Sequence, residues 1–353
     1  MNAKPALISA QALVGAGLID AEAAKQAESV GRHYAIRVTP AMAALIDSYG
    51  EPIKKQFLPD ISELTQMPEE LSDPIGDDAH SPTPGLVHRY PDRVLLKPIS
   101  VCPVYCRYCF RRETVGSAPA MKPTEISDAV AYIANHPEIW EVVLTGGDPL
   151  MLKPPSLARI IKQLEVISHV KILRIHTRVP IADPDRVSPE LVAAVKGTGR
   201  LSSYVAIHCN HASELTEAAV KAAALFADAG IPLLGQSVLL AGVNAEIGPL
   251  EDLMRALVAS RIRPYYLHHL DLAPGTARFR VDISVGQELM KALRGRVSGL
   301  CQPTYVLDVP GGYGKSPLTP SYVQASEKGN WVISDPFGQE HRYPPPVAGL
   351  VDD

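Results

Sequence analysis

The pattern of hydrophobic and polar positions changes near residue 85. Before that point, apolar residues recur at helical spacing, and Thr39-Pro40 precedes an apolar run as an N-cap residue followed by a first-turn Pro. Residues 73–85 are rich in Pro, Gly and Asp, which predicts an irregular linker. Residues 1–85 are therefore predicted to form a helical region that ends in a linker.

After the linker, short apolar runs alternate with longer segments of helical periodicity. The predicted strands are 93–98, 141–145, 172–177, 204–209, 233–240 and 265–270. The predicted helices are 125–135, 156–167, 188–196, 213–229, 247–260 and 284–298. Strands separated by helices predict βαβ units and a parallel sheet.

Six such units indicate an α/β fold, a partial (βα)6 barrel of the TIM type over residues 86–300. An open doubly wound sheet is the alternative. Residues 301–353 then form a C-terminal segment. In either architecture the catalytic groups are expected at the C-terminal ends of the strands, where several of the polar motifs discussed below fall.

Composition narrows the class of protein. The chain has 353 residues, 46% of them hydrophobic, and a formal net charge of −4, so no strong basic field favours nucleic acid. No apolar run approaches the roughly 20 residues of a membrane helix, and the N-terminus lacks the apolar stretch of a signal peptide. Five cysteines, three of them clustered, do not resemble a disulfide framework, so a cytoplasmic location is expected.

The clustered cysteines are Cys102, Cys106 and Cys109. Three thiolates on one loop can hold three corners of a four-iron cluster and leave the fourth iron open to a substrate or cofactor. A structural zinc site is the alternative, but such sites usually have four ligands, commonly in C-x₂-C pairs. Ligand number and spacing therefore favour an iron–sulfur cluster with a chemical role.

Cys-x-x-x-Cys-x-x-Cys, with Tyr108 before the last cysteine, resembles the radical S-adenosylmethionine superfamily. The resemblance implies a [4Fe-4S] cluster whose open iron binds S-adenosylmethionine. Gly146, Gly147 and Asp148, one βα unit later, resemble the motif that receives the methionine amino group in this superfamily.

A Gly-rich segment follows at Asp308-Val-Pro-Gly-Gly-Tyr-Gly-Lys315-Ser316. A phosphate loop requires Gly-x₄-Gly-Lys-Ser/Thr, and the first Gly would fall on Val309, so this reading is rejected. Lys315 on a flexible loop suits a Schiff-base lysine of a pyridoxal phosphate enzyme. A surface turn with a solvated lysine is the alternative.

Cysteine loop and Gly-rich segment occur together in the lysine 2,3-aminomutases, which the chain resembles from about His88 to Leu318. Matching stretches include Pro84–Arg93, Leu173-Arg-Ile-His-Thr-Arg178, Tyr265-Tyr-Leu-His-His-Leu-Asp271 and Pro303–Lys315. The resemblance places pyridoxal phosphate on Lys315 and the substrate's ε-ammonium between Asp271 and Asp308. It also implies that Arg111 binds the substrate carboxylate and that Arg89, Tyr90 and Arg93 bind the cofactor phosphate. His208 and Gln236 are implied to contact S-adenosylmethionine.

These implied roles make chemical sense. Two carboxylates select a cation strongly, and a guanidinium fork suits an α-carboxylate. The resemblance therefore implies an isomerase that converts L-lysine to β-lysine, reduced by a protein such as flavodoxin or ferredoxin, and assembled as a homo-oligomer.

Three alternatives stay open. A shorter branch of the family β-isomerises lysine for attachment to elongation factor P, and this chain shares Tyr265-Tyr-Leu-His268 with that branch. An aminomutase for another amino acid is the second; a glutamate pocket is not expected to carry both Asp271 and Asp308, because like charges repel. The third, from a different class, is a non-catalytic iron–sulfur electron-transfer protein, which would not require Lys315.

Overall fold

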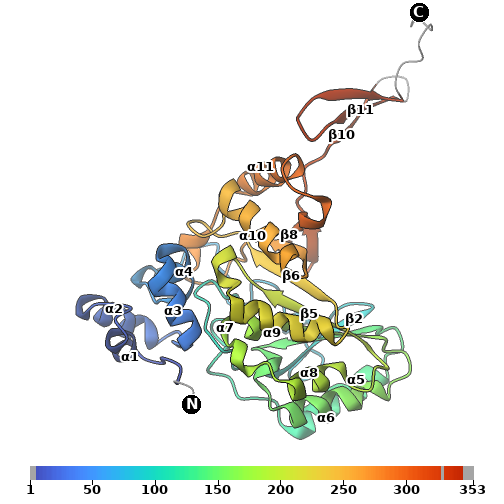
Figure 1. Ribbon diagram of the computed structural model, residues 1–353. Helices are drawn as coiled ribbons and strands as arrows, with labels where there is room; N and C mark the ends of the chain where they lie inside the picture. Colours follow the sequence, from blue (N-terminus) through green and yellow to red (C-terminus); the bar gives the residue numbers. More distant parts are fainter. Residues whose placement is uncertain (1–4, 327–329, 345–353) are drawn as a thin grey trace, which may run out of the picture.

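The computed structural model describes residues 5–326 and 330–344, and its centre is a nine-stranded sheet (Figure 1). The strands are β1 (Leu86–Tyr90), β2 (Arg93–Ile99), β3 (Glu141–Gly146), β4 (Ile172–Thr177), β5 (Ser202–His208), β6 (Leu233–Val238), β7 (Ile262–His268), β8 (Thr304–Val309) and β9 (Gly314–Pro317). Strands β2 to β8 pair in parallel, whereas β1 and β9 pair antiparallel at the two edges.

The spatial order of the strands follows their order in the chain from β1 to β9. A doubly wound sheet would reverse its order at a switch point, so the sheet is instead a nearly closed barrel. Its two edges approach each other where the Lys315 backbone amide donates to the Tyr90 hydroxyl, 2.6 Å away. The predicted partial barrel is confirmed, and β8 adds a seventh parallel strand beyond the six expected.

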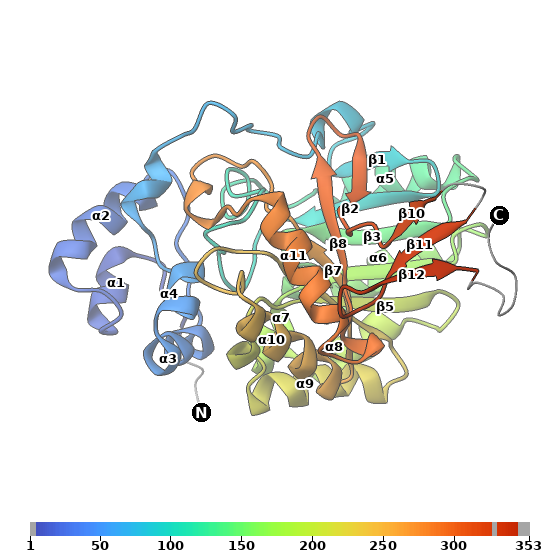
Figure 2. The same cartoon turned by 90° about the horizontal axis from the view of Figure 1, so that it is seen from above.

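Helices cover the outside of the barrel (Figure 2). They are α5 (Pro123–Ala134), α6 (Pro154–Glu165), α7 (Val179–Ala182), α8 (Pro189–Lys196), α9 (Glu217–Asp228), α10 (Ile247–Ala259) and α11 (Ile283–Arg294). Helix α6 shows why they pack there: Leu157, Ile160, Ile161 and Leu164 recur at helical spacing and are buried. The predicted helices are confirmed apart from their ends.

Short 3-10 turns lie between the helices and strands of the described residues. They are η1 (Ile61–Leu64), η2 (Asp78–His80), η3 (Pro149–Met151), η4 (Pro184–Arg186), η5 (Ala212–Glu214), η6 (Ala277–Phe279) and η7 (Gly299–Cys301).

The N-terminal region is helical, as predicted. It contains α1 (Ala10–Gly15), α2 (Ala21–Gly31), α3 (Pro40–Tyr49) and α4 (Glu51–Phe57), which lie at one side of the barrel (Figure 1). The Thr39 hydroxyl accepts a hydrogen bond from the Met42 amide, which confirms the predicted N-cap of α3. Met42, Ile53 and Phe57 are buried in the same core cluster as the barrel helices, so this region extends the barrel's core.

The segment 73–85 is irregular, as predicted, apart from the short turn η2, and hydrogen bonds hold it in place. The Asp73 carboxylate accepts hydrogen bonds from the amides of Asp77 (2.9 Å) and Asp78 (2.8 Å), and η2 follows. Such a turn is built by one side chain bonding to nearby backbone, which is why composition suggested only a loop.

The C-terminal part forms a separate antiparallel sheet of β10 (Val323–Ala325), β11 (Trp331–Ser334) and β12 (Glu340–Tyr343). Figure 1 shows this sheet projecting away from the barrel. Within the described ranges, no helix is both long and apolar enough to cross a membrane.

Candidate active site

A cavity of about 420 Å³ occupies the interior of the barrel. At one end it is lined by the cysteine loop and by groups at the C-terminal ends of strands. At the other end it reaches Arg93 and Glu141, which are the first residues of β2 and β3. The cavity therefore runs along the barrel beyond the C-terminal edge where the catalytic groups were expected.

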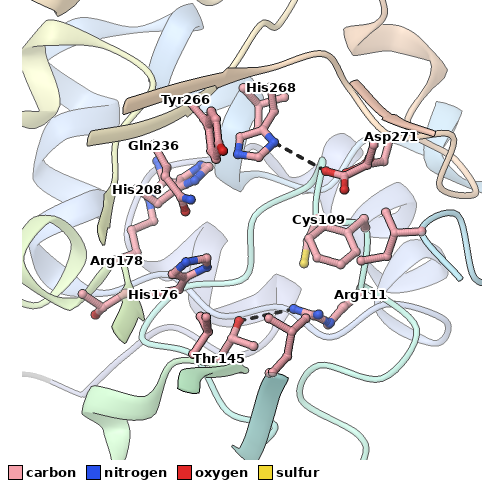
Figure 3. Close-up of a pocket in the computed structure, with 18 of the residues that line it drawn as sticks. Cys109, Arg111, Thr145, His176, Arg178, His208, Gln236, Tyr266, His268 and Asp271 are labelled. Carbon is pink, nitrogen blue, oxygen red and sulfur yellow. Dashed lines mark hydrogen bonds and ion pairs between the residues drawn. The ribbon is translucent and has the colours of Figure 1, made fainter. Parts of the chain in front are cut away.

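All the residues predicted for the site line this one cavity. They are Arg89, Tyr90, Arg93, Cys102, Cys106, Cys109, Arg111, Gly146, Gly147, Asp148, His208, Gln236, Asp271, Asp308 and Lys315. In Figure 3, Asp271 lies above Cys109 and Arg111 lies below it in this view. Residues far apart in sequence are thus brought together.

The three clustered cysteines are half-buried free thiols. Burial raises the pKa of Cys102 and raises that of Cys109 to about 11, and the charge of Cys106 adds to the effect at Cys109. Because burial and neighbouring charge disfavour ionisation, these thiols would become thiolates only beside a compensating cation. Within the described residues no three His, Cys, Asp or Glu side chains surround a single metal-ion position, whereas a four-iron cluster gives each thiolate its own iron.

A buried ionic network holds the cysteine loop. The Glu63 carboxylate, 1% exposed, accepts from Arg107 Nε (3.0 and 3.1 Å) and from the guanidinium of Arg112. Arg107 lies between Cys106 and Cys109, and Glu63 lies in the N-terminal region. The N-terminal region therefore holds the loop in place through the buried carboxylate of Glu63.

A second network lies beside Cys106. Arg178 Nη1 donates to Cys106 Sγ (2.9 Å), and its Nη2 donates to Gln56 Oε1 (3.0 Å) and to the Glu214 carboxylate. His208 Nε2 lies 2.9 Å from the Tyr108 hydroxyl, and burial holds the pKa of His208 well below its usual value. The imidazole of His208 is therefore neutral.

The Gly146-Gly147-Asp148 motif lies at the end of β3. The amides of Gly147 and Asp148 donate to the carbonyls of Ile99 and Val101, just before the cysteine loop. A Cβ on Gly147 would lie 2.5 Å from the Ser100 carbonyl carbon, so only glycine allows this approach. The Asp148 carboxylate accepts from Thr177 Oγ1 (2.8 and 2.9 Å) and from the Arg178 amide (2.7 Å). Burial nevertheless raises the pKa of Asp148 to about 6.

Lys315 lies on β9 directly opposite Asp308 on β8. Its Nζ is 2.6 Å from Asp308 Oδ1, and His268 Nδ1 is 3.6 Å from Asp308 Oδ2. Burial opposes ionisation of Asp308, but the hydrogen bond to His268 and the charge of Lys315 outweigh it and hold the Asp308 pKa well below its usual range. Asp308 is therefore a carboxylate at any ordinary pH.

Asp271 lines the same cavity in a different electrostatic state. Burial, with the charge of Asp308, raises the pKa of Asp271 to about 7 against the opposing charges of Lys315 and Arg111. The cavity therefore contains a second acid whose ionisation a bound cation would favour.

Arg89 is a buried cation in the cavity wall. Its side chain is 7% exposed, and its nearest acids are Asp77 and Asp308, each 3.7 Å away. Its Nε and Nη1 make no hydrogen bond within the described residues, so this guanidinium could donate to a phosphate group. The guanidinium of Arg93 lies over the Tyr90 ring, 3.7 Å from its centre.

His176, Arg178 and His268 were expected near the site as polar groups at strand ends, but without a role. Asp77, Thr145 and Arg174 were not predicted. His176 Nε2 is buried without a hydrogen-bond partner among the described residues. Arg174 and His176 lie two residues apart on β4 and so share one face of the sheet, which strand periodicity could have indicated. Asp77 gave no signal in the sequence, because its partners lie 12 to 34 residues away.

The sequence profile of the radical SAM superfamily matches residues 96–255, and the lysine-2,3-aminomutase profile matches residues 290–348. The L-lysine 2,3-aminomutase of Clostridium subterminale is 42% identical over 88% of this chain and 75% of its own length. The chain belongs to the lysine 2,3-aminomutase family. The L-lysine 2,3-aminomutase of Escherichia coli (strain K12) is 38% identical over 76% of this chain and 78% of its own. The glutamate 2,3-aminomutase of Clostridioides difficile is 35% identical over 84% and 70%.

This family membership settles the reaction class. The chain is a radical SAM isomerase, an aminomutase that acts on a small molecule, and its radical SAM domain implies a [4Fe-4S] cluster and S-adenosylmethionine. Three free thiols on one loop beside a cavity fit that cluster. The non-catalytic electron-transfer alternative is thereby excluded.

Proposed function

We propose that this aminomutase moves the α-amino group of L-lysine to C3 and releases β-lysine, with pyridoxal phosphate bound covalently to Lys315. The observation that carries the proposal is the pair of acids, Asp271 and Asp308, in the same cavity as Lys315 and Arg111. A substrate with a cation at one end and a carboxylate at the other matches these groups. Glutamate offers a second carboxylate instead, which the two acids would repel.

The residues divide the work of binding. Arg111 would hold the α-carboxylate, and Asp308 with Asp271 would hold the ε-ammonium. In the structure Asp308 pairs with Lys315. Asp308 Oδ1 also lies 3.7 Å from Arg89 Nη1, so a substrate ammonium would share this carboxylate with cationic side chains, and Asp271 would supply the second negative charge.

The cofactor phosphate would accept hydrogen bonds from Arg89 Nε and Nη1, which have no hydrogen-bond partner among the described residues. Arg93 and Tyr90 would lie beside it. Bound pyridoxal phosphate supplies a conjugated π system that makes the nitrogen shift accessible to a substrate radical. The cavity walls exclude water from that radical.

At the other end of the cavity, the bound cluster and S-adenosylmethionine supply a 5′-deoxyadenosyl radical able to take hydrogen from the substrate. The Asp148 carboxylate is committed to internal hydrogen bonds. We therefore assign contact with the methionine amino group to the backbone of Gly146 and Gly147, and further contacts to His208 and Gln236. The electron donor is proposed to be a reduced flavodoxin or ferredoxin, and the assembly a homo-oligomer.

A substrate panel tests the proposal. Reconstituted, reduced enzyme with S-adenosylmethionine is given L-lysine, L-glutamate, or L-lysine together with unmodified elongation factor P, its modifying ligase and ATP, under anaerobic conditions. β-Lysine from free L-lysine is expected. Formation of β-glutamate as the preferred product contradicts the proposal, and β-lysine that accumulates only on elongation factor P assigns the enzyme to that pathway.

A further inference from the structure

Asp77 lies behind Arg89 and Arg111, two of the arginines that line the cavity. Its Oδ2 accepts from Arg111 Nη2 (2.9 Å), Arg111 Nε (3.2 Å) and Lys97 Nζ (3.2 Å). Its Oδ1 lies 3.7 Å from Arg89 Nη2. Arg89 and Arg111 line the cavity, whereas Asp77 does not, so this carboxylate contacts them from the side away from a ligand.

The contact uses one edge of the Arg111 guanidinium. Nε and Nη2 point at Asp77, while Nη1 makes only a long contact of 3.4 Å with Thr145 Oγ1 (Figure 3). A guanidinium presents two edges that can each bind a carboxylate. With the Nε edge taken, the Nη1–Nη2 end is left for a substrate carboxylate in the cavity.

The backbone around Asp77 is fixed on both sides. The Asp73 carboxylate accepts from the Asp77 amide, and the Ser81 hydroxyl donates to the Asp77 carbonyl (2.8 Å). A Cβ on Gly76 would lie 2.5 Å from the Gly312 amide nitrogen. The segment 73–85 therefore packs directly on the Gly-rich loop that leads to Lys315, and it links that loop to Arg111.

The Asp77 side chain is a carboxylate in the folded protein at neutral pH. Burial opposes its ionisation, but the charges of Arg111 and Lys97 outweigh burial and lower the Asp77 pKa to about 2. Asp77 is thus ionised at neutral pH, and it neutralises part of the charge of Arg89, Arg111 and Lys97. An ionised carboxylate holds a guanidinium in one orientation better than a neutral amide does.

We infer that Asp77 is a positioning residue for substrate recognition: it fixes the guanidinium of Arg111 so that its free end receives the α-carboxylate of the amino-acid substrate. This inference rests on the proposed function, which gives Arg111 to that carboxylate. Asp77 acts through Arg111 and makes no contact with the substrate. Its effect must therefore depend on whether the substrate has a carboxylate.

That dependence gives a test that a purely structural role would not satisfy. Holoenzyme without S-adenosylmethionine is titrated with L-lysine and with 1,5-diaminopentane, which lacks the carboxylate, and the visible absorbance of bound pyridoxal phosphate is followed. Asp77→Asn is expected to raise the half-saturating concentration of lysine about tenfold and to leave that of diaminopentane within about twofold. Asp78→Asn, an exposed neighbour on the same turn, is the matched control and should change neither.

Asp77→Glu provides a second measurement should Asp77→Asn fail to fold or to retain the cofactor. The longer side chain keeps the charge but displaces Arg111, so it should weaken lysine selectively by a smaller factor. Equal effects on the two amines in either variant, or no effect on lysine, would overturn the inference. Wild-type enzyme that shows no response to lysine would instead refute the proposed function.

Discussion

The two ends of the cavity differ in how their buried carboxylates are satisfied. Around the cysteine loop, the carboxylates of Glu63 and Asp148 each accept several hydrogen bonds within the protein. Around Lys315, Asp271 has a pKa raised to about 7 by burial and by the charge of Asp308. The acids of the first end are therefore neutralised by the protein itself, whereas a bound cation would favour ionisation of Asp271 at the second end.

The largest effect should come from removing the amine at the second end. Lys315→Ala is expected to lose the visible absorbance of covalently bound cofactor and to lower kcat by at least about 10⁴-fold, as removal of a covalent catalytic group does. Lys315→Arg is the matched control for charge: it can keep the ion pair with Asp308 but cannot form the covalent link. Activity near the wild-type level in either variant would remove Lys315 from the mechanism.

At the first end, the expected effect is on stability. Glu63→Gln removes the carboxylate shared by Arg107 and Arg112, and breaking such a buried pair costs about 3–5 kcal/mol. Chemical unfolding measures the loss, and the folded variant should keep the wild-type half-saturating lysine concentration. A large change in lysine binding without loss of stability would erase the distinction between the two ends.

Asp271→Asn should act in the opposite way to Glu63→Gln. It removes one of the two acids proposed for the ε-ammonium, so the half-saturating lysine concentration should rise about 10- to 100-fold. Amino acids without a side-chain cation provide the comparison, since their weak binding should not change. An equal loss for both kinds of substrate would place the ammonium elsewhere.

The same substitution should stabilise the enzyme without substrate at pH 8. The pKa of Asp271 is raised from its ordinary value of 3.8 to about 7, so folding takes up a proton between these values and stability falls as pH rises through that window. Asn has no such titration. Asp271→Asn should therefore unfold at a higher temperature than the wild type at pH 8 and at a similar temperature near pH 4.

The smallest effect is the pH dependence of lysine binding in the wild type. Below pH 7 Asp271 is protonated, and a cationic substrate must first displace that proton. The half-saturating lysine concentration should therefore rise by up to about tenfold per pH unit below 7. This slope, measured by the same absorbance titration, should vanish in Asp271→Asn; a flat profile in the wild type would contradict the role of Asp271.

Much of the barrel was predictable, because alternating strand and helix periods are local properties of the sequence. The strands of 93–98 and 172–177 were found to within a residue. Strands β1, β8 and β9 were not predicted. Strand β9 follows a loop with two glycines and is only four residues long, so it has no period to detect. Its pairing with β8 is set by the hairpin.

The predicted site residues all reach one cavity because strand ends converge in a barrel and because family motifs carry position information. Asp77 and Glu63 could not be found in this way. Their roles depend on contacts with arginines 34 and 44 residues away, and the turns that present them have no hydrophobic period. Long-range ion pairs of this kind are invisible until the fold is known.

The most direct measurement of the central claim follows the nitrogen atom. L-Lysine labelled with ¹⁵N at the α-amino group is incubated with the reduced enzyme and S-adenosylmethionine, and the product is analysed by nuclear magnetic resonance. The proposed function predicts β-lysine with ¹⁵N on C3. Accumulation of 5′-deoxyadenosine without labelled β-lysine would contradict it.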